Sequence, residues 1–480
     1  MQTTLLTDLY QLTMAQGYWL LGRHEQNATF SLFFRKQPFS GGYAVACGLE
    51  KALAYLQNFA FSQDEVAYLA TLQGYDETPL FHPEFLQYLQ QLRLQVEVLA
   101  AAEGTVVFAQ EPLMRVTGSL LQCQLLESYL LNVINFETLV ATKASRIVMA
   151  AEGEPVLEFG LRRAQGNDGA LAASRASFVG GCAATSNVLA GYQYGIPVRG
   201  THAHSWVMSF TSEQESFQAY ADAMPNNCVF LIDTYDTIRG VKHAIAVGKT
   251  LQEKGKQLLG VRLDSGDLTY LSQKVRKILD EAGFAQTKIY ASNDLDELLI
   301  RDIKQQGAKI SVWGVGTKLS TAYEQPALGG VYKLTARQDN SGKWLPTLKM
   351  SEQKNKVNIP GMLQIRRYEL GETFCGDMIY DSLQGEPKQH IIIDPKNSSR
   401  RKQIKHTKFY DLLQPVFNDG KRLTTQQDLF SIQEYAKKQL ASLHEGITRL
   451  RNPHEYPVGL ESELYKLREE MILQARGFDA

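Results

Sequence analysis

The sequence predicts an α/β fold in which a barrel of alternating strands and helices is accompanied by a second, α+β domain. Short apolar runs recur from about residue 150, and each is followed by Gly, Asp or Ser and then by a helical pattern. Successive runs end roughly 20 to 32 residues apart, the length that a strand and its crossover helix require. The seven runs are PVLEFG, ASFVGG, IPVRGT, NCVFLIDT, LLGVRLDSG, TKIYASND and KISVWGVGT.

Helical segments between the later runs support the barrel. Apolar residues recur at helical spacing in residues 269–283 and 296–307, and each segment ends in a glycine that suits a helix C-cap. In a parallel barrel the residues just past the strand ends share one face, and barrel enzymes place their sites there. We therefore expect the residues that end the runs to lie together.

The regions before and after the barrel have a different pattern. A helix is expected at TDLYQLTMAQGYW and a strand at ATFSLFFRK, followed by helical stretches. Strand-like segments return after about residue 325, and amphipathic helices follow from about residue 425. We expect three regions, at 1–130, 131–325 and 326–480. The first and last are combined in one α+β domain, because neither is large enough for a core of its own.

The composition argues against several classes of function. The net charge of -1 gives no general attraction for nucleic acid or for anionic lipid. The five cysteines are scattered and form no CxxC pair, so neither a disulfide framework nor a zinc site is expected. The N-terminal segment has neither the basic region nor the long apolar run of a signal peptide. We expect a cytoplasmic enzyme that acts on a small molecule.

The residues that end the runs combine cations, carboxylates, a histidine and a glycine loop. This mixture suits a phosphorylated sugar, because arginine binds an anion through two parallel hydrogen bonds and carboxylates accept from sugar hydroxyls or bind hydrated Mg²⁺. Histidine is well suited to accept and release a group near neutral pH. The candidates are Arg162, Ser186, Thr201, His204, Asp233, Asp236, Arg262, Asp264, Asp294 and the loop from Gly314 to Thr317.

Each candidate also has a structural interpretation. The GVGT loop offers backbone N–H groups to a phosphate, but it could be only a tight turn between strand and helix. An Arg and an Asp two residues apart, as at Arg262 and Asp264, often form only a salt bridge. Asp233 could cap the next helix. A lone histidine in a segment such as GTHAHSW is more often structural, and His202 lies two residues from His204.

Nine motifs, spread over nearly the whole chain, carry a resemblance to a known family. They are TDLYQLTMAQGYW, EFGLRRAQGNDG, SNVLAGYQYGIPVRGTHAHSW, LIDTYDT, GVRLDSGDL, ASNDLDE, WGVGTKL, KMSEQKNKVNIPGM and NPHEYPVGLE. Together, in this order, they resemble nicotinate phosphoribosyltransferase. Several motifs of this length in the right order are far more specific than any one of them.

The resemblance implies a reaction and a fold. The family joins nicotinate to 5-phosphoribosyl 1-pyrophosphate and releases nicotinate mononucleotide and pyrophosphate, coupled to ATP hydrolysis, as the Preiss-Handler step of NAD salvage. Its fold is a type II phosphoribosyltransferase, an irregular α/β barrel with a second α+β domain built from the N- and C-terminal regions. The implied cofactor is Mg²⁺, bound mainly through pyrophosphate. The implied assembly is a homodimer with shared active sites.

The resemblance also implies roles for individual residues. His204 matches a histidine that ATP phosphorylates, and Asp233 matches the acid that orients it. Thr201 lies with His204 in the nicotinate site. Tyr10 matches an aromatic residue that reaches from the other subunit to one face of the pyridine, and Phe159 matches the ring on the opposite face.

The remaining implied roles concern anions and sugar hydroxyls. Arg162 and Arg262 match cations of the nicotinate pocket, and Asp264 matches an acid that binds the ribose hydroxyls. The phosphate loop corresponds to Gly314, Gly316 and Thr317. Lys349 and Lys356 resemble basic residues that are offered to phosphates, and they could equally be ordinary solvated lysines.

Ser186 favours nicotinate over nicotinamide as the base. Relatives that use nicotinamide have an Asp near this position, whose charge would repel the carboxylate of nicotinate. At about 4 Å and an effective dielectric near 20, two like charges cost roughly 4 kcal/mol. Ser186 therefore argues against the nearest rival, nicotinamide phosphoribosyltransferase.

Two rivals from other classes are a barrel lyase or isomerase and a non-catalytic paralogue. The lyase or isomerase would need a Schiff-base lysine or an acid/base pair at the strand ends, and the runs end in no lysine. The paralogue is disfavoured because the expected residue types occupy the family's chemical positions.

Overall fold

The computed structural model describes residues 3–352, 357–405 and 408–478 of the chain. The chain divides into two compact units, one formed by Met1–Leu139 with Ala327–Ala480 and the other by Val140–Pro326. The first boundary falls within helix α6 (Glu127–Ala150), as does the division predicted after residue 130. In the described part of the chain, none of the helices has the length and apolar character needed to cross a membrane.

The second unit, Val140–Pro326, is built on a parallel sheet that forms a half-barrel. The strand order is β7-β6-β11-β10-β9-β8, and each neighbouring pair is parallel. This confirms the predicted α/β class. The strands are β6 (Val156–Glu158), β7 (Ala184–Thr185), β8 (Val229–Leu231), β9 (Gly260–Leu263), β10 (Lys288–Ala291) and β11 (Val312–Val315).

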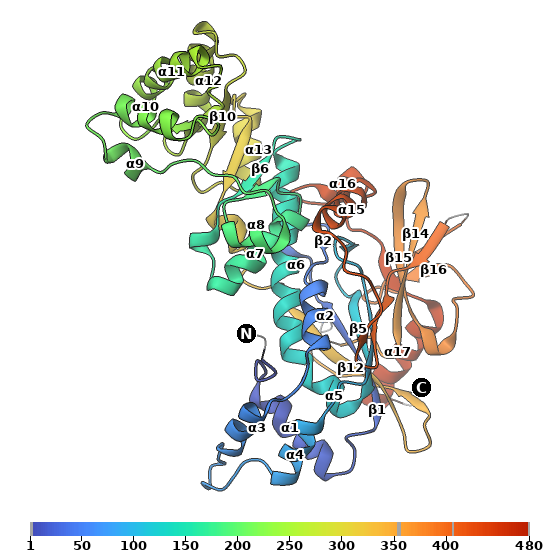
Figure 1. Ribbon diagram of the computed structural model, residues 1–480. Coiled ribbons are helices and arrows are strands. Elements are labelled where there is room, and N and C mark those ends of the chain that lie inside the picture. The colour runs from blue at the N-terminus through green and yellow to red at the C-terminus, as the bar shows by residue number, and fades with distance from the viewer. Residues whose placement is uncertain (1–2, 353–356, 406–407, 479–480) are drawn as a thin grey trace. The chain divides into compact units, whose positions relative to one another are not determined.

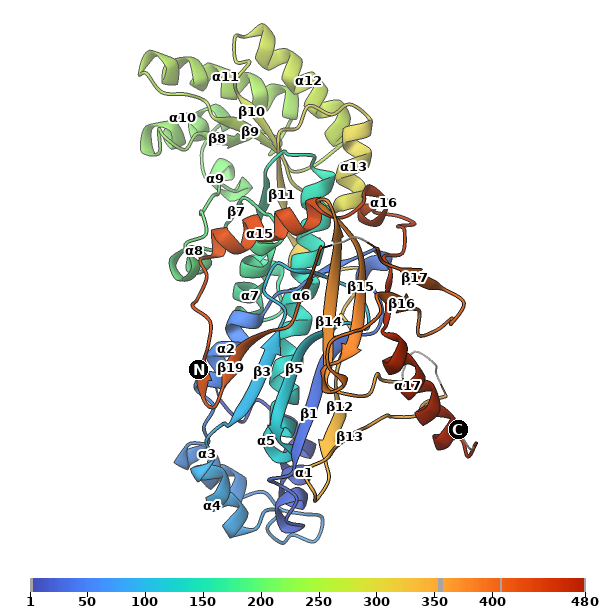
Figure 2. The same cartoon turned by 90° about the vertical axis from the view of Figure 1, so that its right-hand side faces the viewer.

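Helices connect these strands. Figure 2 shows α10, α11 and α12 beside strands β8, β9 and β10. The helices of the second unit are α7 (Asn167–Val179), α8 (Val188–Tyr194), α9 (His204–Met208), α10 (Glu213–Ala223), α11 (Thr237–Glu253), α12 (Leu268–Glu281), α13 (Glu297–Gln305) and α14 (Thr317–Ser320).

Two of the seven predicted strands are not strands. ASFVGG forms the end of helix α7 and its cap at Gly180, because the alanines that precede it favour a helix. IPVRGT contributes only an isolated bridge between Val198 and Thr185. Pro197 has no N–H group to donate, which limits pairing on this segment.

The first turn of helix α11 packs closely against Ile232, the residue that follows strand β8. A Cβ atom at Gly240, in the first turn of α11, would lie 2.0 Å from the backbone oxygen of Ile232. The residue that caps α11 is Asp236, whose side chain accepts from the N–H of Arg239. Asp233 is therefore not the cap of this helix.

The first unit contains a seven-stranded antiparallel sheet. Figure 2 shows β3, β5, β1 and β12 side by side in it. β1 is the strand predicted at ATFSLFFRK, and its Phe30 ring stacks on Tyr332 of β12 at 4.9 Å. In sheet order the strands are β13 (Trp344–Pro346), β12 (Gly330–Gln338), β1 (Asn27–Phe34), β5 (Pro112–Ser119), β3 (Val96–Ala100), β19 (Gln414–Asn418) and β20 (Lys421–Arg422).

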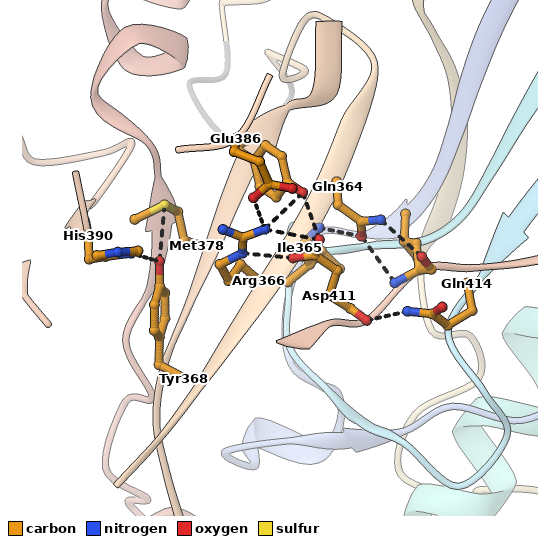
Figure 3. A network of polar contacts seen from close by, with 11 residues as sticks. Gln364, Ile365, Arg366, Tyr368, Met378, Glu386, His390, Asp411 and Gln414 are labelled. Carbon is orange, nitrogen blue, oxygen red and sulfur yellow. Dashed lines mark hydrogen bonds and ion pairs between the residues drawn. The ribbon is translucent and has the colours of Figure 1, made fainter. Parts of the chain in front are cut away.

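A second sheet of six strands belongs to the same unit. Arg366 of β14 joins neighbouring elements, since its Nε donates to Asp411 of β18 at 2.9 Å and its Nη2 pairs with Glu386 (Figure 3). Its guanidinium lies 4.5 Å from the ring centre of Phe409. In sheet order the strands are β17 (Arg401–Gln403), β16 (Ile391–Ile393), β21 (Val458–Leu460), β15 (Thr373–Asp381), β14 (Leu363–Leu370) and β18 (Lys408–Asp411).

Short elements complete the first unit, and Figure 1 labels most of them. The helices expected near the N-terminus and after residue 425 are present. They and the remaining elements are α1 (Leu9–Leu20), α2 (Leu49–Gln57), α3 (Gln63–Ala70), α4 (Pro83–Gln91), α5 (Leu120–Leu125), α15 (Leu429–Ala441), α16 (Glu445–Thr448), α17 (Ser462–Ala475) and the strand pair β2 (Ala44–Val45) and β4 (Val106–Val107).

The close approach of α11 to Ile232 predicts a stability effect. Gly240→Ala should lower the free energy of unfolding by about 1–3 kcal/mol, because the new methyl group must displace the Ile232 backbone. Gly169→Ala is the matched control: Gly169 lies in α7 with open space around it, and alanine there should be neutral or stabilise by up to about 1 kcal/mol. Urea unfolding of both variants measures the difference, and equal effects would contradict the packing argument.

Candidate active site

A cavity of about 390 Å³ lies at the carboxyl edge of the parallel sheet in the second unit. Its walls come largely from segments that follow the strands, the edge at which α/β enzymes bind their ligands. The cavity brings together nine of the binding residues predicted from the sequence: Phe159, Arg162, Ser186, Thr201, Arg262, Asp264, Gly314, Gly316 and Thr317.

A buried carboxylate holds one wall of this cavity. Glu158 is the last residue of β6 and is 1% exposed. It accepts hydrogen bonds from the hydroxyls of Ser174 at 2.9 Å and Thr185 at 2.6 Å. It also accepts from the N–H of Gly160. These donors lie in α7, in β7 and in the turn after β6, so one side chain fixes three neighbouring segments.

The GVGT loop packs against Phe159. A Cβ atom at Gly314 would lie 2.7 Å from the Phe159 ring, and one at Gly316 would lie 3.1 Å from the Phe159 backbone oxygen. Close packing is therefore sufficient to explain both glycines. Thr317 begins α14, a helix of four residues. Phosphate binding by this loop stays a prediction.

Arg262 brings a partly unsatisfied cation to the cavity wall. Its Nη1 donates to Thr201 Oγ1 at 2.7 Å, and its Nη2 lies 3.9 Å from Asp264 Oδ1. Burial lowers the pKa of Arg262 from its usual value, and the charges of Asp264 and Asp233 oppose that shift. The buried Nε has no hydrogen-bond partner in the part of the chain that the structure describes. A buried cation with an unused donor suits an anionic ligand.

Asp233 stabilises the loop after β9. Its Oδ2 accepts from the N–H of Asp264 and from the hydroxyl of Ser265, each at 2.7 Å. Its Oδ1 is buried and has no partner among the described residues. These contacts differ from the prediction that Asp233 orients His204. The reason is the register of the sheet, which pairs Leu231 with Arg262 and so brings the continuation of β8 opposite the continuation of β9.

His204 is oriented instead by a threonine. It begins α9, and its side chain is 39% exposed. Nδ1 lies 3.1 Å from Thr234 Oγ1, and Nε2 lies 3.7 Å from Asp264 Oδ2. A proton on Nδ1 donated to Thr234 would leave the Nε2 lone pair available. Sequence reasoning missed Thr234, although its place directly after Asp233 in LIDTYDT was an available signal.

His202 has the properties of a structural histidine. It is 7% exposed, and its Nε2 accepts from the N–H of Leu231 at 3.3 Å. Its ring lies 5.1 Å from the ring of Tyr220 and 5.9 Å from that of Phe217. Burial lowers the pKa of His202 from 6.5 to about 4, so the ring is neutral near pH 7.

Three further predicted residues, Tyr10, Lys349 and Lys356, belong to the first unit. Tyr10 lies on α1 and is 47% exposed. The Lys349 side chain is exposed, and the backbone N–H of this residue donates to Asn358 Oδ1 at 2.6 Å. Lys356 lies outside the described residues. The predicted contacts of these three residues with a substrate stay predictions.

A buried group in the first unit has the ligand types of a metal site. One ligand atom each of Cys47, Glu103 and Glu137 lies within 4.8 Å of the others. Glu103 accepts from the N–H of Gly48 at 2.6 Å, and Glu137 accepts from the Cys47 thiol at 3.7 Å. These hydrogen bonds account for the cluster, so we assign no metal to it.

Three family models match the chain. They are the nicotinate phosphoribosyltransferase (NAPRTase) N-terminal domain over residues 5–135, the nicotinate phosphoribosyltransferase (NAPRTase) family over residues 155–353, and the nicotinate phosphoribosyltransferase C-terminal domain over residues 364–468. The second of these ranges contains every residue of the cavity described above.

Curated relatives match over nearly the full length. Nicotinate phosphoribosyltransferase of Bacillus subtilis (strain 168) is 44% identical over 98% of this chain and 96% of its own length. The Homo sapiens protein of the same name is 35% identical over 96% of this chain and 95% of its own.

Solved structures have the same fold. The crystal structure of human nicotinic acid phosphoribosyltransferase matches with a TM-score of 0.84 at 32% identity, over 97% of this chain and 99% of that one. Nicotinate-nucleotide pyrophosphorylase from Pyrococcus furiosus matches with a TM-score of 0.69 at 21% identity, over 91% and 94%. This second likeness shows the fold alone.

The burial of His202 predicts a pH dependence of stability. The pKa of His202 is about 4 in the folded chain, and in the unfolded chain it has the ordinary value of 6.5. Between these pH values the unfolded chain therefore binds more protons than the folded chain. This contribution is constant above about pH 6.5, and the free energy of unfolding falls as the pH is lowered from there towards 4. His202→Gln should flatten the fall, since glutamine keeps an acceptor and does not titrate. Urea unfolding at pH 7.5, 6 and 5 checks this; parallel curves for both proteins would refute it.

Proposed function

Since the chain belongs to the nicotinate phosphoribosyltransferase family, we propose that its cavity joins nicotinate to 5-phosphoribosyl 1-pyrophosphate. The pyridine nitrogen bonds to C1 of the ribose as the bond from C1 to pyrophosphate breaks. The products are nicotinate mononucleotide and pyrophosphate, the Preiss-Handler step of NAD salvage. The observation that carries the proposal is that arginines, carboxylates, hydroxyls and an aromatic ring line one and the same cavity.

A buried arginine and two exposed arginines are proposed to bind the anionic groups of the two substrates. Arg262 is the cation suited to the nicotinate carboxylate, because its buried Nε donor is unused among the described residues. Arg162, the second cation proposed for the nicotinate pocket, and Arg163 follow β6 and are exposed, so they also suit the phosphates of the sugar donor. Asp264 is the carboxylate proposed for the ribose hydroxyls.

The base is proposed to lie between two aromatic rings. Phe159 supplies one face from the cavity wall, where Gly314 leaves room for its ring. Tyr10 of a second copy of the chain is the proposed source of the other face, in a homodimer with shared active sites. The exposure of Tyr10 supports this, since about half of its surface is accessible.

The cavity wall suits a magnesium ion bound chiefly by pyrophosphate. Asp264 and Asp294 are lining carboxylates, and oxygen donors of this kind are the ligands that Mg²⁺ prefers. When bound there, the ion would neutralise the charge that develops on the leaving group. The cavity residues bind and orient the two substrates.

ATP is proposed to act through His204. Its γ-phosphoryl group bonds to Nε2 as ADP leaves, and water later takes the phosphoryl group to give inorganic phosphate. Thr234 holds the ring through Nδ1. The Asp264 carboxylate lies 3.7 Å from Nε2 and is also the proposed acid for the ribose. Phosphorylation of His204 and binding of the ribose would therefore both affect the Asp264 carboxylate. This shared group gives a physical basis for coupling ATP hydrolysis to sugar binding.

The proposed setting is the cytoplasm, without nucleic-acid or membrane partners. None of the five cysteines, all of which the structure describes, forms a disulfide, which supports a reducing compartment. The substrates are nicotinate, phosphoribosyl pyrophosphate and ATP.

An assay of the two bases tests the function and the role of His204 together. With phosphoribosyl pyrophosphate, nicotinate should be converted and nicotinamide should not, and ATP should raise the yield of mononucleotide. His204→Ala should lose the stimulation by ATP, because no imidazole remains to carry the phosphoryl group. His82→Ala is the control, since His82 is an exposed histidine of the first unit. Persistent ATP stimulation in His204→Ala would disprove the phosphohistidine, and preferred use of nicotinamide would disprove the proposed substrate.

The charge at position 186 should decide between acid and amide. Ser186→Asp should lower kcat/KM for nicotinate by about a hundredfold, a value below the full repulsion of two charges 4 Å apart because Ser186 is only half-buried. Ser186→Asn introduces a side chain of nearly the same shape as aspartate but without its charge, and this variant should retain most of the activity. Steady-state kinetics with nicotinate compare the two variants; similar losses in both would show a steric effect and exclude an electrostatic one.

A further inference from the structure

A second cavity lies within the first unit, among residues that the proposed reaction does not use. Its volume is about 190 Å³. Its walls come mainly from residues 37–42, 108–110, 394–396 and 453–459, which all belong to the first unit. The last wall is the NPHEYPVGLE motif, to which the reaction assigns no role.

The cavity has an aromatic side held by a buried ion pair. The rings of Phe108 and Tyr456 are both lining residues and stack at 3.9 Å with an interplanar angle of 10°. The Tyr456 hydroxyl donates to Asp377 Oδ1 at 2.8 Å, and Asp377 pairs with Arg367 at 2.5 Å. Both charged residues of that pair are fully buried. The stacked rings are therefore fixed in place rather than free to collapse into the cavity.

One acceptor at the cavity is unsatisfied. Gln37 lines the cavity, and its Nε2 donates to the backbone oxygen of Gly42 at 3.4 Å. Its Oε1 is buried and has no hydrogen-bond partner among the described residues. An unpaired buried acceptor is costly, so this oxygen calls for an N–H or O–H donor.

The backbone around the cavity is strained. Gln110, which lines it, has φ 75°. Phe39 and Ser40, between two lining segments, have φ 56° and 48°, and Asn452, directly before the last wall, has φ 48°. Non-glycine residues in this conformation are costly and concentrate at functional sites. The candidate active site also has such residues at Asn293 and Asp294.

The charges at the rim compensate one another. Asp394 and Glu455 both pair with Arg400, at 3.4 Å and 2.9 Å. Of these residues Asp394 and Glu455 line the cavity with Lys396, and Arg400, from outside the lining, compensates the remaining negative charge. The candidate active site differs, because Arg162, Arg163 and Arg262 outnumber Asp264 and Asp294 among its lining residues. The rim of the second cavity therefore gives an ionic ligand no advantage.

We propose that this second cavity binds an uncharged aromatic heterocycle that carries an amino or carboxamide N–H donor. The ring packs against Phe108 and Tyr456, and the donor bonds to Gln37 Oε1. A volume well below the roughly 300–1,000 Å³ of typical small-molecule sites suits one ring system of about ten non-hydrogen atoms. The ligand class is thus defined by shape, by neutrality and by one donor.

The test compares two probes that differ only in that donor. Nicotinamide carries a carboxamide NH₂ group, and 3-acetylpyridine has a methyl group in its place. Saturation-transfer NMR with the intact enzyme should show nicotinamide binding about tenfold more tightly, the value of one hydrogen bond. Gln37→Leu should remove that difference. Val458→Phe, which fills the cavity from β21, should abolish the binding of both probes at this site.

Controls separate this cavity from the candidate active site. Gly200 lines the other cavity and has open space around it, so Gly200→Phe obstructs that cavity alone. The tenfold preference should persist in Gly200→Phe; its loss there would place the probe in the active site and overturn the proposal. Equal affinity for both probes, or a preference that survives Gln37→Leu, would show that water satisfies Gln37. Thermal melting checks the fold, and Gln37→Met repeats the test if the leucine variant does not fold.

Discussion

The buried carboxylate of Glu158 is the interaction on which the candidate active site depends. A charge that is 1% exposed is tolerated only when hydrogen bonds replace its lost water, and Glu158 receives donors from three segments. One donor, the Ser174 hydroxyl, also accepts from Asn187 Nδ2 at 3.1 Å. Asn187 in turn caps α8. The hydrogen bonds to this one carboxylate therefore position Phe159, the start of α8 and the part of the cavity wall between them.

The same segment gives two histidines opposite properties. His202 is enclosed by aromatic rings and bonded to the backbone of β8, which keeps it neutral and immobile. His204, two residues later, begins a short helix and reaches Thr234 and Asp264 with much of its ring exposed. His202 lines the cavity, but both of its ring nitrogens contact backbone groups, which leaves neither available to a phosphoryl donor. The exposed ring with one nitrogen held is the one able to react.

Apolar runs and the residues that end them predicted most of the second unit. Five runs became strands, and the residues that end four of them line one cavity because all six strands of this sheet are parallel. The partners of Asp233 and His204 could not be predicted in the same way. They depend on the pairing of Leu231 with Arg262, and this register is set by packing between strands rather than by either run alone. The misassigned run ASFVGG shows the other limit, since a short apolar run at a helix end resembles a buried strand.

The two cavities differ in which polar group is left without a hydrogen-bond partner among the described residues. In the second unit the Arg262 Nε is left without a partner in the described structure, so its charge is available to an anion. In the first unit Arg400 is engaged by two acids, and the unsatisfied group is a neutral amide oxygen on Gln37. An anion gains from the unused donor of Arg262 in the first arrangement, and an uncharged N–H donor gains from the unused acceptor of Gln37 in the second. The proposed acid substrate and the proposed uncharged ligand would thus be bound through physically separate groups, without either cavity having to reject the other's ligand by shape.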